Sequence, residues 1–259
     1  MSLAEMEAQV KMRDYNEQMD RDREVFEAEH PAFDIPAAPV AELAGRIEHA
    51  VLTPQATYDD LLAAVRTAER WGVRALVVKP CHVKAAARLL ARSHVLLVSV
   101  VGFPHGSQTT ETKVLETRQA VGAGASEIDM VLNLGALRQR QISDVLLEIR
   151  SVVAAADGRP VKVILETAYL TDEEKALACH LASKAGAAYV KTSTGFGPTG
   201  AAVEDVALMR RATEPRVRIK AAGGIHTYAE AVAMVRAGAD VIGTSATDAI
   251  LHEAFRMAA

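Results

Sequence analysis

Three lysines and one aspartate interrupt apolar, β-branched runs in this 259-residue sequence. Lys191 and Lys220 each end such a run, and glycine-rich turns follow both of them. Lys162 lies near the start of a third run and Asp129 in the middle of a fourth, with Asn133 four residues later on the same predicted strand face. A lone ionised carboxylate is costly in an apolar interior, so Asp129 needs a cation or a hydrogen-bond donor beside it. We therefore expect the three lysines and Asp129 to share one interior.

Lys191 and Lys220 have the setting of an amine nucleophile. A lysine attacks a carbonyl carbon only as the neutral amine, and at the ordinary lysine pKa of about 10.4 very little of it is neutral at pH 7. A second cation nearby, together with partial desolvation, lowers this pKa. The pair therefore indicates Schiff-base chemistry on an aldehyde or ketone. The alternative is structural: an ion-pair network in which Asp129 and the lysines hold the interior closed.

Small-residue turns after two neighbouring runs indicate where a phosphate group could bind. Gly223 and Gly224 follow the Lys220 run, and Gly-Thr-Ser at 243–245 closes the last run. Backbone N–H groups in such turns, together with the amino terminus of a following helix, can bind phosphate. The alternative is a pair of tight turns that bind no ligand.

These runs belong to an alternation of strand-like and helix-like segments from Gly45 onward. Parallel strands with helical crossovers produce this alternation, and strands that are apolar throughout predict a sheet covered on both faces. Eight strand–helix units fit a closed (β/α)8 or TIM barrel, in which the active site lies at the carboxyl ends of the strands. The doubly wound alternative lacks its glycine fingerprint after the first strand. The predicted strands are Arg46–Val51, Arg74–Val78, Val95–Val101, Glu127–Leu132, Val161–Glu166, Ala188–Thr192, Val217–Ala221 and Val241–Thr244.

The amino-terminal segment differs from the barrel, and we divide the chain into an arm with its linker at 1–40 and a catalytic barrel at 41–259. Residues 11–29 are dense in both signs of charge, with apolar residues at alternating three- and four-residue steps. This pattern predicts an amphipathic helix, and the prolines within residues 30–39 end it. The fold class is thus a TIM barrel with an N-terminal helical extension. The arm either lies on the barrel as a solvated helix or makes an oligomer contact.

Composition excludes several classes of protein. The net charge of −4 and a pI of about 6.1 give no electrostatic reason to expect nucleic acid or an anionic membrane as partner. No apolar run reaches transmembrane length, and two cysteines cannot form a disulfide framework, so we expect a reduced, cytoplasmic setting. The eight histidines are scattered without ligand spacing, so we expect neither a metal site nor a cofactor.

Several motifs together resemble the 2-deoxyribose-5-phosphate aldolase family. The resemblance covers residues from about 43 to 252, with the order and spacing of the motifs intact, and leaves the arm outside. The lysine motif Val-Lys-Thr-Ser-Thr-Gly-Phe is the most specific of them. The motifs are Val100–Gly106, Ile128–Val131, Val161–Thr167, Val190–Phe196 and Ile219–Ile225.

The resemblance implies a metal-free class I aldolase that reversibly cleaves 2-deoxy-D-ribose 5-phosphate to D-glyceraldehyde 3-phosphate and acetaldehyde. It implies Lys191 as the Schiff-base nucleophile, Lys220 as the neighbour that lowers its pKa, and Asp129 as a proton-exchanging group. The chain is expected to form a homo-oligomer, a dimer or a tetramer. The residues implied to hold the phosphate are Gly195, Gly223, Gly224 and Ser245.

The sequence departs from the family pattern at the rim of the expected site. The first strand of the family usually reads Asp-His-Thr, and this chain has Glu48-His49-Ala50. Lys79 replaces an asparagine, and Ala246 replaces the second serine at the end of the last strand. These changes leave two alternatives open: a related Schiff-base aldolase that acts on another aldehyde, or a sugar-phosphate-binding barrel without catalysis.

Overall fold

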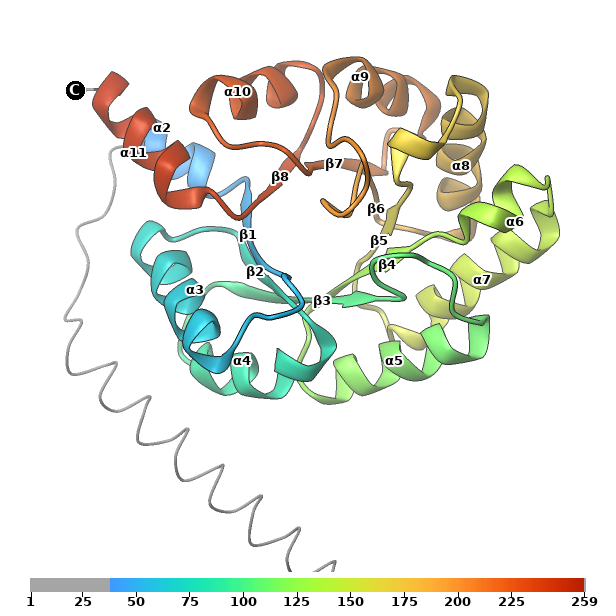
Figure 1. The fold of residues 1–259 in the computed structure, drawn as a ribbon, viewed down its shortest axis with the longest axis horizontal. Coiled ribbons are helices and arrows are strands. Elements are labelled where there is room, and N and C mark those ends of the chain that lie inside the picture. The colour runs from blue at the N-terminus through green and yellow to red at the C-terminus, as the bar shows by residue number, and fades with distance from the viewer. Residues whose placement is uncertain (1–37, 259) are drawn as a thin grey trace, which may run out of the picture. The chain divides into compact units, whose positions relative to one another are not determined.

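The computed structural model describes residues 38–258. The helix predicted over residues 11–29 and nearly all of the proline-containing linker lie outside the described residues. The predicted boundary at residue 41 falls within the first described helix, α2 (Ala38–Ala44). This short helix packs beside the last helix of the chain, α11 (Thr247–Ala258), at the outside of the barrel (Figure 1).

Eight parallel strands close into one barrel, and each strand pairs with its neighbour in chain order until β8 pairs with β1 (Figure 1). The (β/α)8 architecture predicted from the strand–helix alternation is therefore confirmed. Predicted and observed strands differ by one or two residues at some ends, as at Glu166, which lies beyond the end of β5 in a left-handed conformation with a φ of 51°. The strands are β1 (Ile47–Val51), β2 (Ala75–Val78), β3 (Leu96–Val101), β4 (Glu127–Val131), β5 (Val161–Ile164), β6 (Tyr189–Lys191), β7 (Arg218–Ala222) and β8 (Val241–Thr244).

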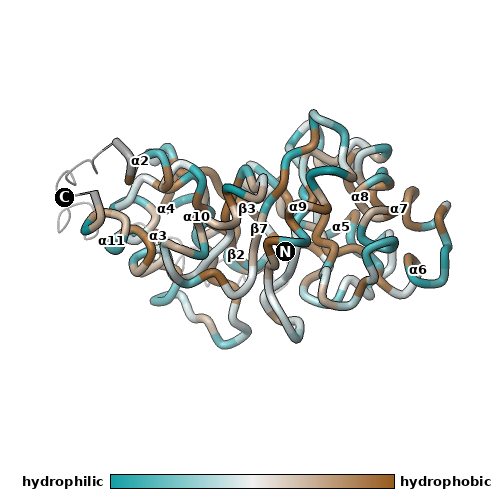
Figure 2. The backbone as a smooth tube through the Cα atoms, turned by 90° about the horizontal axis from the view of Figure 1, so that it is seen from above, coloured by the Kyte–Doolittle hydropathy of each residue, from teal (hydrophilic) through white to brown (hydrophobic). Residues whose placement is uncertain are grey.

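A ring of helices surrounds the barrel (Figure 1). Figure 2 shows the tubes of α5, α7 and α8 changing between brown and teal along their length, as expected for helices with one face on the sheet and one in water. Among the described residues, no helix is both long and apolar enough to cross a membrane. The helices other than α2 and α11 are α3 (Tyr58–Trp71), α4 (Val83–Leu89), α5 (Thr110–Gly122), α6 (Leu134–Arg138), α7 (Ile142–Ala155), α8 (Asp172–Ala185), α9 (Val203–Ala212) and α10 (Tyr228–Arg236), with short 3-10 turns η1 (Pro80–His82) and η2 (Thr167–Tyr169).

Local sequence signals start and stop the helices between the strands. In α3, the Thr57 side chain accepts the backbone N–H of Asp60, and the Asp60 carboxylate accepts the backbone N–H of Thr57, which forms a capping box. The same helix ends at Gly72, whose φ of 61° lies in the left-handed region that favours glycine. Because the helix begins and ends at fixed residues, the crossover has the length needed to bring the chain back to the start of the next strand.

Strand register brings the candidate residues to matching heights. Lys191 on β6 pairs directly with Lys220 on β7, and Asp129 on β4 pairs with Lys162 on β5. Gly243 on β8 makes room for Lys220, because a Cβ at position 243 would lie 2.9 Å from both Lys220 Cε and Ala222 Cβ. A missing side chain on one strand thus permits a long side chain from the next.

We predict that Gly243→Ala destabilises the barrel by about 1–3 kcal/mol, because the added methyl group overpacks the interior against Lys220. The matched control is Gly122→Ala, since a Cβ at position 122 meets nothing within 4 Å. That variant should keep or slightly raise stability, because alanine favours the helix by up to about 1 kcal/mol over glycine. Urea unfolding curves of both variants measure the difference. Equal stabilities would contradict the close packing around Lys220.

Candidate active site

Asp129 is the centre of the candidate site. Its carboxylate is fully buried and receives hydrogen bonds from Lys162 on one oxygen and from both Lys191 and Lys220 on the other. The Nζ–O distances are 2.9 Å for Lys162, 2.9 Å for Lys191 and 2.7 Å for Lys220. The structure therefore brings together the four side chains that the sequence predicted to share one interior.

Three further charged residues, Glu48, Arg74 and Glu127, join this cluster, and none of them was predicted from the sequence to belong to it. Glu48 on β1 forms ion pairs with Lys220 and Arg74. Glu127 lies 2.6 Å from Lys162 Nζ and accepts hydrogen bonds from Arg74. One signal was present: Glu127 and Asp129 are two residues apart on a strand, so they point to the same side of it.

The cluster holds more positive than negative groups. Among the ion pairs of the described residues, four cations (Arg74, Lys162, Lys191 and Lys220) meet three carboxylates (Glu48, Glu127 and Asp129). Burying an uncompensated charge is costly, and an ionisable group can avoid that cost by becoming neutral. The cluster is therefore electrically balanced when one amine has lost its proton.

Lys191 is the amine whose pKa falls. Burial, together with the charge of Lys220, lowers the pKa of Lys191 to about 8 against the opposing effect of Asp129. Lys162 behaves in the opposite way: its carboxylate neighbours raise its pKa above the ordinary value despite burial. The three lysines hold the pKa of Asp129 well below its usual range. Lys162 is thus a permanent counter-ion, and Lys191 is the amine available as a nucleophile.

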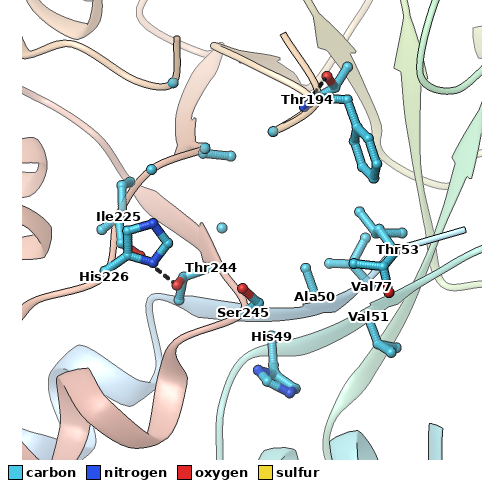
Figure 3. Close-up of a pocket in the computed structure, with 18 of the residues that line it drawn as sticks. His49, Ala50, Val51, Thr53, Val77, Thr194, Ile225, His226, Thr244 and Ser245 are labelled. Carbon is cyan, nitrogen blue, oxygen red and sulfur yellow. Dashed lines mark hydrogen bonds between the residues drawn. The ribbon is translucent and has the colours of Figure 1, made fainter. Parts of the chain in front are cut away.

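The two amines open into a cavity of about 800 Å³ at the carboxyl ends of the strands. Figure 3 shows the side chains of Ala50 and Ser245 at the edge of this space, with Val77 and Thr53 on the side of β1 and β2. The imidazole of His49 points away from it. His49 Nδ1 lies 2.8 Å from the Thr247 hydroxyl, and burial lowers the pKa of His49 to about 4, so this ring has a structural role.

The four predicted phosphate-binding residues all line this cavity. Gly195, Gly223 and Gly224 line it with φ values of 88°, 91° and 72°, which only glycine adopts without strain. Ser245 lies just before the amino terminus of α11 (Figure 3). All four predicted residues therefore line the same pocket, and they come from backbone turns and from the segment before a helix amino terminus.

The loop after Lys191 is fixed by a buried carboxylate. Glu166 accepts a hydrogen bond from the Thr194 hydroxyl and shares the Thr194 backbone N–H between its two oxygens at 3.3 Å. The Thr194 hydroxyl oxygen accepts the Phe196 N–H at 3.0 Å. Farther along, the Ala201 N–H donates to the Gly223 carbonyl at 2.9 Å. The glycine turns after β6 and β7 therefore form one connected surface.

Two residues singled out in the sequence lie outside the reactive cluster. The expectation that Asn133 shares the face of Asp129 is wrong, because β4 ends at Val131 and Asn133 caps α6, accepting the Ala136 N–H at 3.1 Å. Lys79 donates to the carbonyl oxygens of Thr53, Pro54 and Ala56 at 2.9–3.1 Å and so holds the loop after β1. Within residues 38–258, no three His, Cys, Asp or Glu side chains are grouped to hold a metal ion.

The fold and the site define a (β/α)8-barrel protein with a buried cluster of amines, two of which line a cavity at the carboxyl ends of the strands. A family profile described as DeoC/LacD family aldolase matches residues 40–253. The chain belongs to this aldolase family, as the resemblance in its motifs implied. The deoxyribose-phosphate aldolase of Clostridium kluyveri is 48% identical over 213 residues, which cover 82% of this chain and 98% of the relative.

Other relatives agree with this assignment. The deoxyribose-phosphate aldolase of Thermococcus gammatolerans is 49% identical over 208 residues, covering 79% of this chain and 92% of that protein. A solved structure, the tetrameric deoxyribose phosphate aldolase from Aeropyrum pernix, superposes with a TM-score of 0.79 at 34% identity. The superposition covers 86% of this chain and 94% of that one. The likeness therefore extends over nearly the whole length of each relative.

We predict that the rate of imine formation at Lys191 rises about tenfold per pH unit below pH 8 and levels off above it. Below the pKa of about 8 the amine is protonated and inert, and above it the amine is free. Lys220→Met removes a cation that lowers this pKa, so the rise should move above pH 8. Borohydride trapping of an aldehyde adduct over pH 6–10 measures both profiles. The control, Lys184→Met at an exposed site on α8, should leave the profile unchanged.

Proposed function

We propose that this protein is a class I aldolase that reversibly cleaves 2-deoxy-D-ribose 5-phosphate to D-glyceraldehyde 3-phosphate and acetaldehyde. One observation carries the proposal: Lys191 is a buried amine with a pKa of about 8, it shares Asp129 with Lys220, and it opens into the cavity at the strand ends. Its relatives carry the name of this activity. A barrel that only binds sugar phosphates does not require a lysine whose pKa lies close to neutral pH.

Cleavage begins with the free amine of Lys191. Its nitrogen attacks the aldehyde carbon of the open-chain sugar, a C–N bond forms, and the carbonyl electrons move to the oxygen, which takes up a proton. Loss of this hydroxyl as water gives an iminium ion. Asp129 and Lys220 lie next to the nitrogen and exchange these protons, with a water molecule between them and the reacting oxygen.

The iminium ion then accepts the electrons of the breaking carbon–carbon bond. The hydroxyl on C3 loses its proton, its oxygen electrons form the new carbonyl of glyceraldehyde 3-phosphate, and the C2–C3 bond electrons move to form an enamine on Lys191. Protonation of the enamine carbon and addition of water release acetaldehyde and restore the amine. Every step is a proton or electron-pair shift, so the reaction consumes no cofactor and requires no metal ion.

The glycine turns after β6 and β7 and the residues before α11 bind the phosphate in this proposal. Gly195, Gly223 and Gly224 present backbone near the phosphate, and the Ser245 hydroxyl donates to it. The phosphate then holds the sugar at one end while C1 reaches Lys191. Binding energy from this remote group orients the reacting carbon.

We further propose that the protein works in the cytoplasm as a homo-oligomer, a dimer or a tetramer, as the tetrameric relative from Aeropyrum pernix supports. Its partners are small molecules, and nucleic acid and membranes are not among them. The exposed Phe255 and Met257 near the end of α11 are apolar side chains that an oligomer contact could cover.

We predict that acetaldehyde followed by borohydride labels Lys191 and no other lysine at neutral pH. The expectation follows from its low pKa and its position in the cavity. Peptide mass spectrometry identifies the label, and Lys191→Met should abolish both the label and cleavage of deoxyribose 5-phosphate. A label on Lys162 would contradict the assignment, because that lysine is held as a counter-ion by three carboxylates. EDTA should leave the activity unchanged.

We predict that Ala50→Thr lowers the KM for deoxyribose 5-phosphate about two- to tenfold, because it restores a hydroxyl at the cavity edge (Figure 3). One net hydrogen bond contributes about 0.5–1.5 kcal/mol. Ala50→Val is the control, since valine has nearly the same shape without the hydroxyl. Steady-state kinetics of both variants decide the matter. A KM that rises with threonine would indicate a pocket shaped for another aldehyde.

A further inference from the structure

The two amines that share Asp129 are held unequally. Lys191 Nζ lies 2.9 Å from Asp129 Oδ2, and within the described residues this is its only ion pair. Lys220 Nζ lies 2.7 Å from the same oxygen and also forms an ion pair with Glu48. Lys220 therefore faces two carboxylates, and Lys191 faces one that it shares.

Glu48 is built into the cluster from several strands. It lies on β1, is fully buried, and divides its two oxygens between different cations. One oxygen bonds Lys220, and the other bonds Arg74 and lies 3.4 Å from Lys162 Nζ. Arg74 and Lys162 are in turn paired with Glu127, so the Glu48 carboxylate cannot move away from Lys220 without breaking other ion pairs.

We propose that Glu48 is the positioning residue that keeps the proton on Lys220 and thereby leaves Lys191 as the free amine. The inference rests on the proposed Schiff-base chemistry. A proton that can reside on either of two neighbouring amines stays on the one with more negative charge beside it. Both lysines line the cavity, so access alone does not choose between them. The number of carboxylates beside each lysine decides which of the two keeps the proton.

Glu48→Gln removes the charge and keeps the length of the side chain. The cluster then has four cations and two carboxylates, and Lys220 loses its advantage over Lys191. We expect borohydride trapping with acetaldehyde at pH 7.5 to label both Lys191 and Lys220 in this variant, against Lys191 alone in the unmodified protein. The pH at which trapping rises should fall by about one unit, because less negative charge holds the protons on the amines.

Two further variants separate this role from general damage to the interior. Glu127→Gln removes an equally buried carboxylate of the same cluster, one that pairs with Arg74 and Lys162 and with neither cavity amine. Its label should stay on Lys191 even where its stability falls. Glu48→Asp keeps the charge, so its label should also return to Lys191. A merely structural role for Glu48 would lower the amount of folded protein without moving the label.

The outcomes are distinct. A folded Glu48→Gln protein that labels only Lys191, with an unchanged pH profile, overturns the role of Glu48 and leaves the proposed function intact. No label on any lysine of the unmodified protein overturns the Schiff-base chemistry itself. If Glu48→Gln does not fold, trapping of the unmodified protein over pH 6–10 still tests the inference: it requires Lys191 to be labelled in preference to Lys220, and equal labelling of the two amines contradicts it.

Discussion

The excess of positive charge inside a closed barrel is the constraint on which this site depends. Each buried ion costs several kcal/mol unless partners surround it, and the ion pairs of Arg74, Lys162 and Lys220 with Glu48, Glu127 and Asp129 supply those partners. One further cation, Lys191, has no carboxylate to itself. Its lowered pKa relieves the imbalance, so the same electrostatic arrangement that stabilises the interior also produces a reactive amine.

Barrel closure is what makes this arrangement possible. Apart from Arg74, which lies just before β2, the charged side chains come from five different strands, and register places them at neighbouring heights inside one ring. The closing pair of strands, β1 and β8, brings Glu48 beside Gly243, whose missing side chain leaves space for Lys220. An open sheet with the same strand order would place β1 and β8 at opposite edges, and Glu48 on β1 would then lie far from Lys220 on β7.

The cluster has an anchoring end and a reacting end. Arg74 and Glu127 lie away from the cavity, where the Arg74 guanidinium also donates to the Tyr189 hydroxyl at 3.1 Å, and Arg218 stacks 4.2 Å from the centre of the Tyr189 ring. Lys191 and Lys220 line the cavity. Stability and activity are therefore coupled through Lys162 and Glu48, which contact both ends: loss of either leaves a charge unpaired in the interior.

The barrel, its eight strands and three of the charged residues at its centre could be predicted from the amino-acid sequence. Lys191, Lys220 and Asp129 could be identified because a charged residue within an apolar strand needs a partner in the protein interior. The alternation of side chains along a strand also indicates which side of the sheet each one faces. The glycine turns were identifiable because each follows a strand at the end where barrels bind ligands. The pairing of each carboxylate with its amine, by contrast, could not be predicted, because it depends on how distant strands pack together. Arg74 lies just before β2 and Glu127 begins β4, and a charged residue at the start of a strand can face either solvent or the interior. Asn133 was predicted to lie on a strand, but it caps the helix α6. The unequal holding of Lys191 and Lys220 depends on strand register and barrel closure, which are set by packing between residues distant in the chain.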